Sequence, residues 1–201
     1  MLYHRDALKA AALAVSKDPI RFALQGVHLD GKLAVGTDGS ILIAVPAGPH
    51  VEDDFPIRFG DGKLDCAPAT IDAKSILEAV KATPRDGVMP ILQCVQIAGD
   101  GEMRQLRATN LDRDHNATVR TLGQYPKWEQ VLDLAVNEPA KFSVGLAVDV
   151  VLKAFKALQA AGVDAVKVDF RDPYKALVLS GSSDLGEVLS IVMPYRLPEV
   201  K

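Results

Sequence analysis

The chain has 201 residues, with 23 Lys and Arg against 26 Asp and Glu, which gives a formal charge of −3 at pH 7. Hydrophobic residues make up 48% and charged residues 24%, a balance that excludes a disordered tail, a coiled coil or a collagen-like repeat. A protein held on nucleic acid by its whole surface is usually basic, so any DNA contact requires positive charge gathered on one face. No apolar run reaches the roughly 18 residues that a membrane helix needs, and we expect a cytoplasmic protein.

Three segments have the apolar spacing of amphipathic helices. The first is predicted over residues 6–15, with Asp6 as its N-cap. The second is predicted over residues 72–81 and the third over 147–160, where Gly162 ends it. The third helix carries an apolar stripe that we expect to be buried, formed by Val148, Val151, Leu152, Phe155 and Leu158.

Each predicted helix is followed by short extended segments and tight turns, the pattern of an antiparallel meander. After the first helix, the turns Asp30-Gly31 and Asp38-Gly39 separate its segments. The predicted strands cover residues 26–29, 33–37, 41–45, 91–98, 104–109, 117–122, 165–170, 176–180 and 187–193, with additional strands at 63–67 and 141–144 leading into two of the helices.

This helix-plus-meander plan recurs about three times and predicts an α+β protein. One helix on a small sheet buries only one side of each, so such a module should pair with a copy of itself. We therefore predict one domain of two modules over residues 1–133 and a third, half-domain module over 134–201. Residues 46–54 and 133–139, rich in Pro, acidic and small residues, are the predicted linkers.

Catalysis has little support in the sequence. The cluster Asp112-Arg113-Asp114-His115-Asn116 could suggest a metal or acid–base site, and a hydrolase or nuclease would depend on it alone. A solvated turn is the favoured interpretation, because no second set of ligands follows at a suitable spacing. No phosphate-binding glycine loop is present, and Cys66 and Cys94 are expected to be reduced thiols. We predict a binding protein without catalytic residues, cofactor or metal.

Three separated motifs stand out beside this plan. The first is Arg21-Phe22-Ala23-Leu24-Gln25-Gly26 with the later turn Thr37-Asp38-Gly39, and the second is Tyr125-Pro126-Lys127-Trp128. The third closes the segment 142–197 with Val192-Met193-Pro194-Tyr195-Arg196-Leu197. In order and spacing they resemble the bacterial DNA polymerase III beta subunit, the sliding clamp family. The likeness is to the middle domain and the second half of the last domain.

The resemblance implies a hydrophobic groove that receives peptides from DNA polymerases and clamp loaders. Its anchoring side chains would be apolar, with a methionine able to adapt to different peptides. Carried over position by position, the groove residues are Leu24, Thr37, Gly39, Ser40, Leu42, Pro126, Gln130, Val131, Val192, Met193, Pro194, Tyr195, Arg196 and Leu197.

The resemblance also implies that duplex DNA is encircled without sequence specificity, by helices that line a central hole. A lysine-bearing helix face would reconcile the net charge of −3 with DNA contact, although a merely solvated helix face is the alternative. The expected DNA-facing residues are Lys9, Lys17, Arg21, Lys74, Lys81, Lys153 and Lys156.

Partners follow from the same resemblance. The family's chain carries six such modules and two chains close a ring of twelve, so about three modules predict a homo-oligomer, either a dimer or a tetrameric ring. The alternative function is a non-encircling clamp-like adaptor or competitor, which would bind replication proteins without DNA contact.

Overall fold

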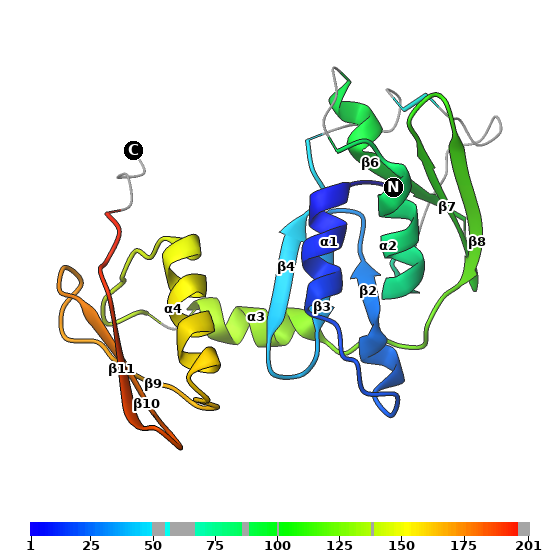
Figure 1. Ribbon diagram of the computed structural model, residues 1–201. Coiled ribbons are helices and arrows are strands. Elements are labelled where there is room, and N and C mark those ends of the chain that lie inside the picture. The colour runs from blue at the N-terminus through cyan, green and yellow to red at the C-terminus, as the bar shows by residue number, and fades with distance from the viewer. Residues whose placement is uncertain (50–54, 57–66, 86–88, 100, 138, 197–201) are drawn as a thin grey trace. The chain divides into compact units, whose positions relative to one another are not determined.

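The two compact units of the chain are Met1–Asp133, called unit 1, and Leu134–Lys201, called unit 2 (Figure 1). The computed structural model describes residues 1–49, 55–56, 67–85, 89–99, 101–137 and 139–196. In these residues four α-helices accompany three antiparallel sheets, which confirms the predicted α+β class. Within the same ranges, none of the helices combines the length and the apolar character needed to cross a membrane.

Unit 1 contains two helix-plus-meander modules and the first part of a third helix, which continues into unit 2. The first module contains β1 (Leu2–His4), α1 (Arg5–Leu13), η1 (Phe22–Gln25), β2 (Gly26–Leu29), β3 (Leu33–Thr37) and β4 (Leu42–Pro46). The second contains β5 (Ala69–Asp72), α2 (Ala73–Ala82), η3 (Pro90–Gln93), β6 (Cys94–Ala98), β7 (Met103–Thr109) and β8 (Asp114–Arg120), and α3 (Trp128–Asn137) comes next. Unit 2 contains α4 (Val148–Ala160), β9 (Lys167–Asp169), β10 (Leu177–Ser183) and β11 (Gly186–Val192).

The two modules of unit 1 exchange their first strands. β1 leads into α1 but pairs with β6 of the second module, with Tyr3 opposite Val95. β5 leads into α2 but pairs with β2 of the first module, with Ile71 opposite Val27. The sheets therefore have the orders β4-β3-β2-β5 and β1-β6-β7-β8, and neither sheet is complete without the other module.

Helices α1 and α2 lie side by side in opposite directions, α1 against β3 and β4 and α2 against β7 and β8 (Figure 1). Arg5 at the start of α1 is buried, and its guanidinium donates to the backbone oxygens of Thr83, at 3.0 Å, and Pro84 at the end of α2. Side chains of both helices and both sheets form one core, which includes Tyr3, Leu8, Val27, Leu29, Ile71, Ile76, Val95, Ile97 and Leu106.

Of the two helix-end residues that the sequence predicts, one is confirmed and one is wrong, and a further cap was not predicted. Asp72 caps α2 by accepting from the backbone N–H of Ser75 at 3.0 Å. Gly162, with φ of +81°, follows α4 and lets the N–H of Val163 reach the carbonyl of Leu158, so the predicted terminator is confirmed. The predicted cap Asp6 is wrong, because the His4 ring accepts from the Asp6 N–H and the helix begins one residue earlier.

Two predicted connections differ from the structure. Residues 133–137 of the predicted linker 133–139 are helical, because α3 continues through them, and this helix was missed. The strand predicted at residues 141–144 is wrong, because these described residues form no strand. In unit 1 such a strand pairs with the sheet of a second module, and the described residues of unit 2 contain only one module. Of the predicted strand 63–67, residues 63–66 lie outside the described residues, and the strand before α2 is β5 instead.

In unit 2, α4 lies on the three-stranded sheet of order β11-β10-β9. Leu158 of α4 is buried with Leu177, Leu179 and Val192, as its stripe predicts. The predicted burial of three other stripe residues is wrong, because Val148, Leu152 and Phe155 are exposed. Amphipathic spacing identifies a helix face that suits burial, but a neighbouring element must supply the cover.

Candidate functional site

The predicted turn at residues 37–40 is held by side-chain hydrogen bonds. The Asp38 carboxylate accepts from the backbone N–H groups of Ser40, at 2.8 Å, and Ile41, at 3.0 Å. These hydrogen bonds lower the pKa of Asp38, because they stabilise its charged form. Gly39 has φ of +93°, a conformation that favours glycine. The turn thus presents a defined backbone edge with Gly39 and Ser40 exposed.

Arg21 supports this turn from the neighbouring segment. Its guanidinium donates to the backbone oxygen of Asp38 at 2.7 Å and lies 3.8 Å from the Asp18 carboxylate. A Cβ added at Gly39 would meet the same guanidinium at 2.8 Å. Arg21, expected to face DNA, therefore has a structural partner in the turn, and Lys17 lies nearby in sequence as an exposed residue.

An apolar cluster lies beside the turn and joins several predicted groove residues. Val35, Tyr125 and Trp128 are buried together, and Leu24 and Leu42 are half-buried against them. Two motifs that are a hundred residues apart in the sequence thus meet in unit 1. Thr37 is buried at the end of β3, while the other predicted groove residues of this part, Pro126, Gln130 and Val131, are exposed at or near the start of α3.

His28 was not predicted as a site residue, yet it packs directly on Tyr125. The two rings are stacked, with centroids 4.8 Å apart, and His28 Nδ1 lies 3.1 Å from the Thr70 hydroxyl. Burial lowers the pKa of His28 below its usual 6.5, although Asp30 and Glu129 oppose this effect. Burial also raises the pKa of Tyr125 to about 12. The ring pair is therefore neutral at pH 7.

The lowered pKa of His28 predicts a loss of stability in mild acid. The unfolded chain takes up this proton at pH values where the folded chain resists it, so the contribution is complete above pH 6.5 and declines as the pH falls below it. We expect the thermal unfolding midpoint of the protein to fall between about pH 7.5 and 5.5, and His28→Gln to flatten that fall. Equal pH slopes in the two proteins would contradict this origin.

Unit 2 carries the rest of the predicted groove residues at its C-terminal tail. Val192 is buried in the unit 2 core, while Met193 and Tyr195 are exposed. The tail is fixed to the segment before α4 by a hydrogen bond of 2.8 Å from the N–H of Tyr195 to the carbonyl of Gly145. Leu197 lies outside the described residues.

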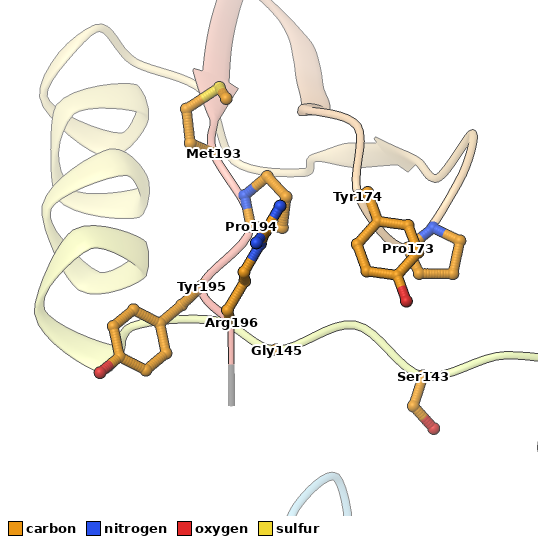
Figure 2. A pocket seen from close by; sticks show the side chains of 8 residues that line it. All are labelled: Ser143, Gly145, Pro173, Tyr174, Met193, Pro194, Tyr195 and Arg196. Atoms are coloured by element: carbon orange, nitrogen blue, oxygen red, sulfur yellow. The ribbon is translucent and has the colours of Figure 1, made fainter. Parts of the chain in front are cut away.

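The tail borders a hollow of about 810 Å³ (Figure 2). Figure 2 shows Pro173 and Tyr174 on one loop and the tail on the other side. Its lining residues are Ser143, Gly145, Pro173, Tyr174, Met193, Pro194, Tyr195 and Arg196. Sequence reasoning missed the first four, and the signal that could have indicated them is the turn at Asp172-Pro173, whose exposed neighbour is aromatic.

The basic residues expected to face DNA occur on helices in both units. On α2, Lys74 and Lys81 are exposed and lie seven residues apart, opposite the buried side of Ala73, Ile76, Ala79 and Val80. Lys9 of α1 is half-exposed, 3.8 Å from Asp6, and α2 also carries the exposed Glu78. In unit 2, Lys153 and Lys156 are exposed on α4. Acidic side chains therefore accompany lysines on the helices of unit 1.

The acidic cluster at residues 112–116 forms a turn and the start of a strand. The Asn110 side chain accepts from the N–H groups of Asp112 and Arg113, while Asp114 and His115 belong to β8. Among the described residues, His, Cys, Asp and Glu form no group that could hold a metal ion. Cys94 is buried, which raises its pKa to about 11 and keeps it as a thiol, and Cys66 lies outside the described residues.

The fold of this chain matches that of solved bacterial sliding clamps. The Bacillus subtilis DNA polymerase sliding clamp matches with a TM-score of 0.64 and 20% identity, over 96% of this chain and 48% of the clamp. The Thermotoga maritima DNA polymerase III beta subunit matches with a TM-score of 0.62 and 18% sequence identity, over 96% of this chain and 49% of that subunit. A Pseudomonas aeruginosa clamp bound to griselimycin matches with a TM-score of 0.62 and 17% sequence identity, over 96% of this chain and 49% of the clamp.

This chain therefore resembles the DNA polymerase III beta subunit in fold and spans about half the length of these solved clamps. No protein-family model and no curated protein sequence matches it.

Proposed function

We propose that the protein is a sliding-clamp-like processivity factor that holds a DNA polymerase on duplex DNA. The proposal rests on the structure of unit 1. Its two antiparallel helices lie on two sheets as part of a fold that matches solved clamps, and Lys74 and Lys81 of α2 are exposed on the side away from the core. A lysine surface attracts phosphates without reading bases, which is the interaction that a sliding protein needs. The net charge of −3 keeps that attraction local.

The proposal includes encirclement of DNA by a homo-oligomer. Because the chain spans about half of a solved clamp, a ring of clamp size needs more copies than a ring of those proteins. The decisive experiment loads the protein onto nicked circular duplex, linearises the circle and measures what remains bound. Retention on circles with release after linearisation is expected, because only a closed ring depends on DNA topology. Equal retention on both forms would refute encirclement.

The second half of the proposal is peptide binding at the two apolar surfaces. In unit 1 this surface consists of Leu24, Leu42 and the exposed start of α3, and in unit 2 it consists of the tail beside its hollow. Met193, with 67% of its surface exposed, is the most adaptable of the predicted anchors. Hydrophobic peptides from a DNA polymerase or a clamp loader are the expected ligands, and none of the proposed chemistry is enzymatic.

Removal of two anchoring side chains should strongly weaken the binding of such a peptide. For Met193→Ala combined with Leu24→Ala we expect a loss of about 1–3 kcal/mol in binding a polymerase-derived peptide, measured by titration calorimetry. Griselimycin, which one solved clamp binds, provides a second probe. Met103→Ala is the matched control, since Met103 is an exposed methionine on β7 outside both surfaces. Unchanged affinity in the double variant would place the peptide site elsewhere.

A second candidate is a clamp-like adaptor or competitor that binds replication proteins without DNA. Asp6 and Glu78 favour this candidate, because their carboxylates reduce the positive potential of the helices of unit 1. Such a protein would bind the polymerase peptide normally and show no affinity for circular or linear duplex. The circle experiment and the peptide titration together therefore distinguish the two candidates.

A further inference from the structure

Helix α4 exposes apolar side chains at positions that are buried in both helices of unit 1. At the first helical position, Arg5 of α1 is 5% exposed and Ala73 of α2 is 8% exposed, whereas Val148 of α4 is 73% exposed. At the eighth position, Ala12 and Val80 are 9% and 2% exposed, whereas Phe155 is 41% exposed. The helix start fixes this alignment, so the difference reflects what covers each helix.

In unit 1 the two helices pack antiparallel on each other. The start of α1 reaches the end of α2 through the hydrogen bond from Arg5 to Thr83, and Ala12, Ala73 and Val80 belong to the core that both helices share with the sheets. In unit 2, Val148 and Phe155 lie seven residues apart on one side of α4, beside the stripe that contains Val151 and Leu158 and packs on the sheet. Val148 and Phe155 thus form an exposed apolar face on α4 beside its packed side, and exposed apolar faces of this kind are candidate interaction surfaces.

The segment that leads into α4, residues 144–147, also lacks a sheet partner among the described residues. In unit 1, β1 and β5 pair with the meander of the opposite module. In unit 2, residues 144–147 form no strand. The Gly145 carbonyl accepts from the N–H of Tyr195 in the tail, and the Ala147 carbonyl accepts from the N–H of Val151 in α4. β9 pairs with β10 on one edge, and the described residues place no strand on its other edge. The free edge of β9 corresponds to the edges of β2 and β6 that receive a strand in unit 1, and residues 144–147 correspond to the strands β5 and β1 that are given.

We propose that two copies of this chain pair through unit 2 and build together the two-module domain that unit 1 builds alone. A two-fold axis would set two α4 helices antiparallel, cover Val148 and Phe155, and let residues 144–147 of each copy pair with β9 of the other. The occupant is a second copy because the surface supplies both parts of the exchange, so it is complementary to itself.

Charge supports the same pairing. Asp149 and Lys156, seven residues apart, border the exposed apolar face of α4 on one side. When two such helices run antiparallel, the Asp149 end of one meets the Lys156 end of the other, and this occurs twice across the axis. A parallel arrangement would instead set like charges together. The face is therefore built for an antiparallel copy of itself.

Sedimentation velocity of the full chain at micromolar concentration, without DNA, tests the inference. The natural sequence is expected to be a dimer or a larger even-numbered assembly, and Phe155→Glu should weaken the pairing by about 100-fold. Phe155 lies outside the unit 2 core cluster, so this variant should keep its fold. Leu189→Glu is the matched control, because Leu189 is also an exposed apolar residue but lies on β11. It should leave the assembly unchanged.

A charge exchange gives a second, independent readout. Asp149→Lys alone should weaken the pairing about fivefold, since two ion pairs become repulsive, and adding Lys156→Asp should restore it. A monomeric natural protein, a Phe155→Glu protein that pairs normally, or a double variant without rescue would overturn the inference. It deepens the homo-oligomer of the proposed function, but the DNA-free measurement keeps the two separable: a dimer that ignores DNA contradicts only the clamp activity.

Discussion

Gly36→Ala is expected to destabilise unit 1 by at least about 2 kcal/mol. Gly36 lies in β3, directly beneath α1, and a Cβ at this position would meet the backbone oxygen of Ala11 at 2.0 Å. No rotamer change relieves a contact between Cβ and a backbone oxygen, so α1 or β3 must move. Movement of α1 also disturbs the Arg5 bonds to the end of α2, which makes the effect extend across both modules.

Urea unfolding monitored by circular dichroism measures this loss as a shift of the midpoint. Gly123→Ala is the matched control, because a Cβ there meets no atom within 4 Å. The control should leave the midpoint unchanged or raise it slightly, since the same glycine-to-alanine change then acts mainly by lowering the entropy of the unfolded chain. A Gly36→Ala midpoint as high as that of the control would show that α1 does not need this close approach.

Lys74→Glu combined with Lys81→Glu should reduce the affinity for duplex DNA by at least about tenfold at low salt. Both side chains are exposed on the side of α2 away from the core, so their reversal replaces attraction to phosphates by repulsion without a packing cost. Loss of two phosphate contacts per chain should also lower the slope of log affinity against log salt by about two. Fluorescence anisotropy with labelled duplexes of different sequence measures both quantities.

Two further variants make the result specific to the helix face. Lys32→Glu changes charge in the same direction at the exposed Asp30-Gly31-Lys32 turn and should affect binding little. Glu78→Lys adds a positive charge beside Lys74 and Lys81 and should raise the affinity. If the double reversal and the Lys32 variant weaken binding equally, only net charge matters and the helix face is not the DNA surface.

Local signals in the sequence were sufficient for most elements. The turns at Asp30-Gly31 and Asp38-Gly39 fixed strands 26–29 and 33–37 to the residue, because the aspartate side chain bonds and glycine conformations are properties of the turn itself. Periodicity located α1, α2 and α4 within one or two residues. Helix α3 was missed because its first turn follows a proline motif and its last turn has the composition of a linker.

The structure brings some of the expected groove residues together, while their role as a peptide site stays a prediction. In unit 1, Leu24 and Leu42 pack against Tyr125 and Trp128, which lie far later in the sequence. His28, which stacks on Tyr125, and Tyr174, which faces the tail, lie in strands and turns with no motif of their own. Their roles depend on neighbours distant in sequence, and a single sequence contains no record of those neighbours.

Turn chemistry and apolar periodicity act over a few residues, so the helix-plus-meander modules could be predicted from the chain alone. The net charge likewise indicated that positive charge is limited to parts of an acidic protein. The exchange of β1 and β5 between modules and the exposure of Val148 and Phe155 on α4 could not be predicted in this way. Strand pairing and helix burial each need a second partner, and its presence or absence is a property of the assembled chain.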